Sequence, residues 1–268
     1  MLLLNGFEVT AKHFADGTTD VKIPIQWIAD HPSHVLEWRF DSNEEMVLLY
    51  FLTKHVRSKS PDPIRLVLPY IPNARKDRAH RQEDVFTLKY FSEFINSLQF
   101  ASVTVLDPHS NVSEALIDRI RIVRSEATVK ALIASIGENT LAFYPDEGAV
   151  KRYADGIGAS YVYGMKMRDK TTRRILHFDV FGEVESLPGA NVLMIDDICA
   201  SGKTLYIAAQ KLKELGAGKL YVYVSHCENQ AVDSELLSSG IIEKLYTTNS
   251  ILRASHPLIS VVDVPGVE

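Results

Sequence analysis

Short apolar segments of strand length alternate with segments of helical periodicity along most of this 268-residue chain. Two strands that are joined through a helix usually run parallel, because the helical crossover returns the chain to the same edge of the sheet. The alternation therefore predicts an α/β fold in which mostly parallel sheets are covered by helices. The expected strands are 20–27, 35–40, 64–69, 101–107, 140–144, 160–166, 174–180, 191–196, 219–226 and 243–248; the expected helices are 43–57, 84–98, 125–137, a short one from Asp146, 202–215 and one near 230–239.

The same alternation occurs in both halves of the chain, with no internal sequence repeat and no low-complexity linker. The length suits one large domain or two of ordinary size, and the hydrophobic content of 46% is enough for a substantial core. We expect two α/β lobes, 1–125 and 126–268, with the last residues able to return to the first lobe.

Composition narrows the range of partners. The net charge is -5 and no basic block is present, so we expect no nucleic-acid partner. No apolar stretch approaches ~18 residues, and the first residues, MLLLNG, lack the basic region of a signal peptide, so we expect no membrane partner. Cys199 and Cys227 lack metal-ligand spacing, and a cytoplasmic protein is predicted.

Ligands of open α/β sheets bind at the carboxyl ends of the strands, so residues that follow buried strands are the first candidates for a site. The strongest segment is VLMIDDICASGKT (192–204), where a strand ends in Asp196 and Asp197 and a glycine-containing loop opens a helix. Such a loop offers backbone N–H groups to a phosphate, and the acids can accept from ribose hydroxyls. A Walker A loop is excluded, since its first glycine would fall at Asp197. An N-cap cluster on a surface loop is the other interpretation.

Two further strand ends carry candidate metal ligands. Asp146 and Glu147 follow the strand TLAFY and lie in the first turn of the predicted helix. The helix dipole favours acids there, so capping explains them, but Asp146 is also a suitable ligand for a hard cation. Asp107 and His109 flank Pro108 after another buried strand, where His109 is either structural or a ligand.

A fourth strand end is basic. The segment LPYIPNARKDRAHR (68–81) places several cations after a strand. A run of charges is usually a solvated face, but at the carboxyl end of a buried strand these side chains suit a nucleoside triphosphate.

Together these segments resemble the ribose-phosphate pyrophosphokinase (phosphoribosyl diphosphate synthase) family, from KHFADGT (12–18) to TTNSI (247–251). The matching motifs, in the family's order, are PYIPNARKDR (69–78), Asp107-Pro108-His109, PDEGAVKR (145–152), Lys166-Met167-Arg168 and IDDICASGKT (195–204). The resemblance implies two lobes of the type I phosphoribosyltransferase fold. It also implies transfer of the β,γ-diphosphate of ATP to the anomeric hydroxyl of ribose 5-phosphate, which gives phosphoribosyl diphosphate and AMP.

The resemblance assigns residues to four tasks. It implies that the catalytic residues are Lys166, Arg168 and His109, with Lys166 and Arg168 on a mobile loop. It implies ATP contacts from Phe14, Asp16, Arg75, Lys76 and Arg78. It implies ribose-phosphate contacts from Asp196, Asp197, Ser201, Gly202, Lys203 and Thr204. It implies Mg²⁺ as cofactor, positioned by His109 and Asp146. Because Phe14 and Asp16 would contact the adenine bound by a neighbouring subunit, a dimer or larger homo-oligomer is expected.

The departures from the family pattern leave alternatives open. Thr18 replaces a glutamate on the adenine side, which affects nucleotide preference. Ala200 replaces an aspartate and Lys203 a small residue, so a larger acceptor such as ADP-ribose is the second hypothesis. A catalytically inactive regulatory subunit is the third, although Lys166 and Arg168 are both present. A phosphoribosyltransferase would need neither the ARKDR segment nor two lobes.

Overall fold

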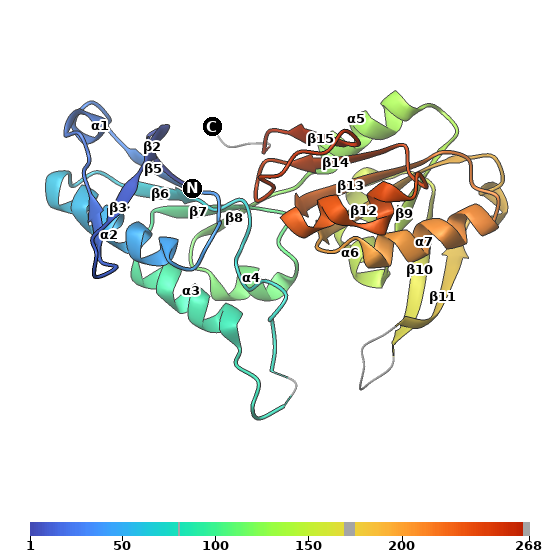
Figure 1. Ribbon diagram of the computed structural model, residues 1–268, viewed down its shortest axis with the longest axis horizontal. Helices are drawn as coiled ribbons and strands as arrows, with labels where there is room; N and C mark the ends of the chain where they lie inside the picture. The colour runs from blue at the N-terminus through green and yellow to red at the C-terminus, as the bar shows by residue number, and fades with distance from the viewer. Residues whose placement is uncertain (80, 169–174, 265–268) are drawn as a thin grey trace. The chain divides into compact units, whose positions relative to one another are not determined.

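The computed structural model describes residues 1–79, 81–168 and 175–264, apart from the side chains of Arg168, Ile175 and Leu176. The chain forms two compact units (Figure 1). The first consists of Met1–Val123 together with Val264, and the second is Arg124–Asp263.

A six-stranded sheet forms the first unit, in the order β2-β1-β5-β6-β7-β8. Strands β5 to β8 are parallel, whereas β1 pairs antiparallel with both β2 and β5. A separate hairpin is made by β3 and β4. The strands are β1 (Leu2–Leu4), β2 (Phe7–Val9), β3 (Ala11–His13), β4 (Thr19–Val21), β5 (His34–Trp38), β6 (Ile64–Val67), β7 (Ser102–Leu106) and β8 (Ile120–Val123); the helices are α1 (Gln26–Ala29), α2 (Glu45–Lys59), α3 (Thr87–Ser97) and α4 (Asn111–Leu116).

A seven-stranded sheet forms the second unit, in the order β11-β10-β9-β12-β13-β14-β15. All neighbours are parallel except β10 and β11, which form an antiparallel hairpin that projects beyond the rest of the sheet in Figure 1. The strands are β9 (Thr140–Tyr144), β10 (Tyr161–Arg168), β11 (Ile175–Gly182), β12 (Asn191–Cys199), β13 (Leu220–Cys227), β14 (Lys244–Thr248) and β15 (Ile259–Val262); the helices are α5 (Glu126–Ile136), α6 (Glu147–Ile157), α7 (Lys203–Glu214) and α8 (Glu235–Ser238), with 3₁₀ turns at Val184–Ser186 and Asn229–Asp233.

Helices cover both faces of the second sheet, so its central strands are mostly apolar and buried on both faces. All five residues of β9 are buried. Phe143 packs in the cluster that contains Leu205 and Leu212 of α7, whereas Tyr144 packs in the cluster that contains Tyr153 of α6. Alternate residues of one strand therefore face α7 and α6, and this alternation decides which side chains at the strand ends α6 can reach.

The predicted α/β class with mostly parallel sheets is confirmed. The strand expected at 20–27 is wrong beyond Val21, because the chain leaves β4 there and begins α1 at Gln26. The helix expected near 230–239 is a 3₁₀ turn and the short α8, separated by the extended Ser234. Strands β1, β2, β3, β8 and β15 and helices α1 and α4 were not predicted. Within the described ranges, no helix combines the length and apolar character needed to cross a membrane.

Candidate functional site

The loop between β12 and α7 is the segment expected to hold a ribose phosphate. Strand β12 runs on to Cys199, and α7 begins at Lys203 directly after Gly202. Gly202 has φ +68°, and a Cβ on it would lie 3.1 Å from Ser234 Oγ and 3.3 Å from Leu236 Cβ. Glycine suits this position for two reasons: a positive φ is unfavourable for residues with a Cβ, and the space that a Cβ would need is already occupied. The first N–H groups of α7 lack acceptors within the helix, as at any helix start.

Asp196 and Asp197 end the buried part of β12. Asp197 is buried, and the side chain of Asp196 is 20% exposed. Arg152 of α6 donates from Nη2 to Asp197 Oδ1 at 2.7 Å and approaches Asp196 Oδ1 at 3.5 Å. The backbone N–H of Asp197 donates to Asp196 Oδ1 at 2.9 Å. Burial, followed by the neighbouring Asp197 carboxylate, raises the pKa of Asp196 well above its ordinary value, and Arg152 opposes this rise.

Asp146 has two partners in the structure. As N-cap of α6 it accepts from the backbone N–H of Ala149 on Oδ1 at 3.1 Å. Its Oδ2 accepts from Lys166 Nζ at 2.7 Å. Burial would raise the pKa of Asp146, but the hydrogen bond and charge of Lys166, the Ala149 amide and the charge of Arg152 together lower it. The carboxylate therefore stays ionised at neutral pH beside a cation.

Lys166 lies on β10, which differs from the loop position expected from the family resemblance. Because side chains alternate along a strand, Lys166 faces Asp146 while its neighbours Met165 and Met167 point away and are 47% and 60% exposed. Arg168 ends β10, but its side chain and residues 169–174 lie outside the described part of the chain.

The carboxyl ends of β9 and β12, together with β10 and α6, thus gather three acids and two cations in the second unit. Four of the five had been singled out in the sequence; Arg152 had not been given a role. The sequence could have pointed to Arg152 through its position in α6, between the buried Ala149 and Tyr153, because a cation at a buried position needs an acidic partner. Among the described residues, no group of three or more His, Cys, Asp and Glu side chains is arranged to hold a metal ion.

The basic segment and the Asp107–His109 segment follow neighbouring strands, β6 and β7, of the first unit. Asp77 connects them. It accepts from Arg78 Nε at 3.0 Å and Nη2 at 3.2 Å, and Arg78, Ser110 and the charge of His109 lower its pKa against the effect of burial. A hollow of about 430 Å³ next to this segment is lined by Tyr70, Asn73, Arg75 and Lys76.

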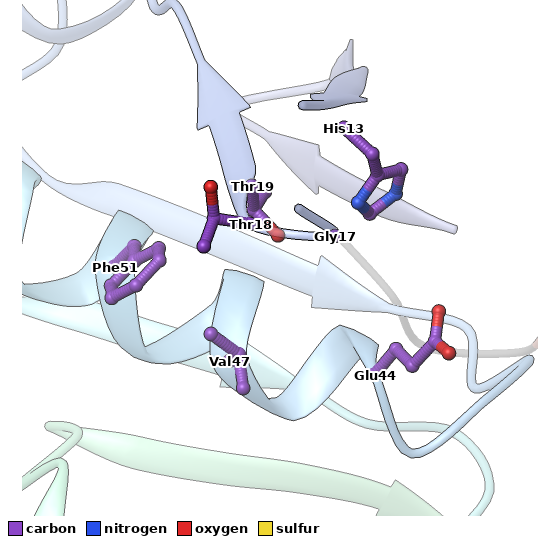
Figure 2. Close-up of a pocket in the computed structure, with 7 residues that line it drawn as sticks. All are labelled: His13, Gly17, Thr18, Thr19, Glu44, Val47 and Phe51. Carbon is purple, nitrogen blue, oxygen red and sulfur yellow. The ribbon is translucent and has the colours of Figure 1, made fainter. Parts of the chain in front are cut away.

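The FADG segment forms the turn between β3 and β4. Asp16 Oδ1 accepts from the backbone N–H and the hydroxyl of Thr18, at 3.0 and 2.7 Å, and fixes the turn. Phe14 is 60% exposed. A hollow of about 570 Å³ lies between this hairpin and α2. Figure 2 shows that α2 contributes the apolar side chains of Val47 and Phe51 to it. The residues that line the hollow are His13, Gly17, Thr18, Thr19, Glu44, Val47 and Phe51.

Comparison with known proteins agrees with this architecture. The chain matches the crystal structure of phosphoribosylpyrophosphate synthetase from Mycobacterium smegmatis with a TM-score of 0.76 at 18% identity, over 96% of this chain and 86% of that one. This likeness concerns the fold, and with the sheets described above it defines a two-unit α/β protein with a type I phosphoribosyltransferase-like fold.

Several curated relatives in sequence share one name. The ribose-phosphate pyrophosphokinase of Sulfolobus acidocaldarius is 26% identical over 96% of this chain and 89% of its own length. Those of Thermococcus kodakarensis and Listeria monocytogenes are each 27% identical, over 91% and 89% of this chain and 86% and 76% of their own lengths. No protein-family model matches the chain. Over about nine-tenths of its length, the chain is therefore similar to ribose-phosphate pyrophosphokinases, which are transferases.

Proposed function

We propose that the protein transfers the β,γ-diphosphate of ATP to the anomeric hydroxyl of ribose 5-phosphate, giving phosphoribosyl diphosphate and AMP. The observation that carries the proposal is the cluster in the second unit, where Asp146, Lys166 and the Asp196–Asp197 pair lie beside a glycine-containing loop. The relatives' name, ribose-phosphate pyrophosphokinase, supports the same reaction.

The acceptor is held by the loop after β12. Asp196 and Asp197 accept hydrogen bonds from the ribose hydroxyls. The 5-phosphate binds the backbone N–H groups of the loop and of the first turn of α7, where the helix dipole favours an anion. Hydroxyl and ammonium groups in the same segment complete this site, from Ser201, Lys203 and Thr204 around Gly202.

The transfer step forms a bond from the anomeric oxygen to the β-phosphorus of ATP and breaks the bond from that phosphorus to the oxygen that leaves with AMP. The proton of the attacking hydroxyl passes to solvent water. Lys166 and Arg168 neutralise the charge that develops on the transferred group, as positioned cations do in phosphoryl transfer. Lys166 exchanges its hydrogen bond to Asp146 for one to the diphosphate.

Magnesium fits the residues that are present. Asp146 already holds a cation, the Lys166 ammonium, on Oδ2. Mg²⁺ is usually bound by one or two carboxylates together with substrate phosphates, so a site with few protein ligands suits it. Asp146 would hold the ion, which would supply charge neutralisation of the ATP phosphates.

The ATP site is assigned to the first unit. Arg75, Lys76 and Arg78 bind the phosphates, with Arg78 oriented by Asp77. Phe14 and Asp16 contact the adenine bound by another copy of the chain, which makes the active species a dimer or larger. A protein diluted to monomers should therefore lose activity, and a monomer with full activity would contradict this assignment.

The direct test is to incubate the protein with ATP, Mg²⁺ and individual ribose derivatives and to measure AMP. We expect AMP in proportion to phosphoribosyl diphosphate when ribose 5-phosphate is present, and none without an acceptor. Absence of AMP with every acceptor would overturn the proposal in favour of a regulatory subunit.

A second candidate acceptor is ADP-ribose. Ala200 and Lys203 replace an acid and a small residue of the family pattern, and Lys203 is exposed at the start of α7. The two changes shift the local charge by about two units towards positive, which favours a more anionic ligand. A higher kcat/KM for ADP-ribose than for ribose 5-phosphate would establish this alternative. Lys203→Gly should then reduce kcat/KM for ADP-ribose more than for ribose 5-phosphate.

A further inference from the structure

We propose that Arg152 is a positioning residue of the acceptor site, which holds the carboxylates of Asp196 and Asp197 oriented so that they accept hydrogen bonds from the ribose. The inference rests on the proposed function, because it assigns the acid pair to the ribose.

The geometry gives Arg152 one guanidinium nitrogen between two carboxylates. Its Nη2 lies 2.7 Å from Asp197 Oδ1 and 3.5 Å from Asp196 Oδ1, with 15% of the Arg152 side chain exposed. In the described part of the chain, the hydrogen bonds to Asp196 all end on Oδ1, from Arg152 and from the Asp197 amide. Asp196 Oδ2 is therefore the atom left to accept from a ligand hydroxyl.

The sheet explains why α6 supplies this cation. Asp197 follows Leu193 and Ile195 on the face of β12 that packs against α5 and α6. The base of Arg152 is fixed, because Asp146 caps α6 and the flanking Ala149 and Tyr153 are fully buried. The guanidinium carbon also lies 5.9 Å from the centre of the Tyr153 ring.

The charged groups around Asp196 affect its pKa in opposite directions. Burial raises the pKa of Asp196 most, and the neighbouring carboxylates of Asp197 and Asp146 raise it further. The Arg152 guanidinium opposes this rise, while the Lys166 ammonium is hydrogen-bonded to Asp146. A protonated Asp196 would lose its charge and bind a ribose hydroxyl less strongly.

The experiment compares Arg152→Met, which keeps much of the side-chain volume, with Arg152→Lys, which keeps the charge. Lys151→Met on the exposed side of α6 is the matched control. We expect Arg152→Met to raise KM for ribose 5-phosphate ~10–100-fold, the usual effect of losing a charge-assisted hydrogen bond. We expect KM for ATP to change by about twofold or less, and the acid limb of kcat/KM to move to higher pH. Arg152→Lys should recover part of both effects, and Lys151→Met should match the wild type.

Three results with the Arg152 variants overturn the inference by itself. The first is a folded Arg152→Met protein with an unchanged KM for ribose 5-phosphate and an unchanged acid limb. The second is an equal loss for both substrates together with lower thermal stability, which would make Arg152 merely structural. The third applies if Arg152→Met does not fold, in which case Arg152→Lys is the deciding variant. Wild-type values of kcat and KM in Arg152→Lys, with an unchanged acid limb of kcat/KM, would then overturn the inference. A wild-type protein that neither binds ribose 5-phosphate in calorimetry nor forms AMP overturns the proposed function, and this inference with it.

Discussion

Lys166 and Asp146 neutralise each other across 2.7 Å, so each side chain in the pair constrains the other. Lys166→Ala should lower kcat by ~10²–10³-fold, because a cation aimed at the transferring group is lost. The ion pair is partly exposed, so the free energy of unfolding should fall by about 1 kcal/mol or less. Turnover close to that of the wild type would contradict the catalytic role, with Lys151→Ala on exposed α6 surface as control.

The substitution Asp146→Asn distinguishes the helix-capping role of Asp146 from its proposed role as a metal ligand. Asparagine also caps helices well, so a cap alone predicts a loss of about 1 kcal/mol or less and an unchanged magnesium requirement. We expect the magnesium concentration for half-maximal activity to rise, because a neutral amide is a poorer ligand for a hard cation. Identical magnesium titrations of mutant and wild type would leave Asp146 as a cap without a metal role.

The Asp146 carboxylate also predicts how stability depends on pH. Its pKa is lowered in the folded protein, so its ionised form adds stability above the pKa of an unfolded aspartate, ~3.9. This contribution should disappear as the pH falls from about 4 through the lowered pKa. Chemical unfolding of wild type and Asp146→Asn at several pH values should show a difference near pH 7 that shrinks below pH 4. A difference that grew on acidification would contradict the direction of the shift.

At the scale of elements, the turn from β12 into α7 depends on Gly202, and Gly158 at the end of α6 provides a matched comparison. Gly202 and Gly158 both have φ +68°, but only Gly202 meets Ser234 and Leu236 at 3.1–3.3 Å, whereas a Cβ on Gly158 meets nothing within 4 Å. Both alanine variants should lose about 1 kcal/mol from backbone strain. Gly202→Ala should lose more and should also raise KM for the acceptor. Equal effects of the two substitutions on KM would show that the loop geometry does not matter for binding.

Periodicity predicted the elements that are buried on a regular pattern. Leu205, Ala208 and Leu212 mark one face of α7, and the fully buried β9 appears as an apolar run. The short β1 and β2 were missed although Asn5-Gly6, both with positive φ, is a hairpin turn, because three-residue strands show little alternation.

The candidate site was predictable wherever residues follow strands directly. Asp146 and Asp196 fall at strand ends in the sequence. Arg152 and Asp77 did not emerge, because their positions depend on a helix packing against a sheet and on two loops meeting. Sequence order does not record either contact.

At the scale of the whole molecule, each unit has its own sheet and its own buried core. A ligand stabilises the part that binds it, by about 2.7 kcal/mol at a hundredfold excess over its Kd. Ribose 5-phosphate should therefore slow hydrogen exchange in β9, β12 and the first turn of α7, while exchange in β5 to β7 stays the same. Protection of the first unit alone would contradict the assignment of the acceptor to the second.

Asp146 caps α6 with one oxygen and meets Lys166 with the other, and this has a consequence for how position 146 can evolve. The residues that cap a helix without loss are Asp, Asn, Ser and Thr, and three of these four are neutral. Selection for folding alone would let the four drift freely at position 146. Selection for a charged partner of Lys166 would keep aspartate alone. A library of all four residues, sorted once for folded protein and once for growth that depends on the activity, would show which of the two pressures acts at this position.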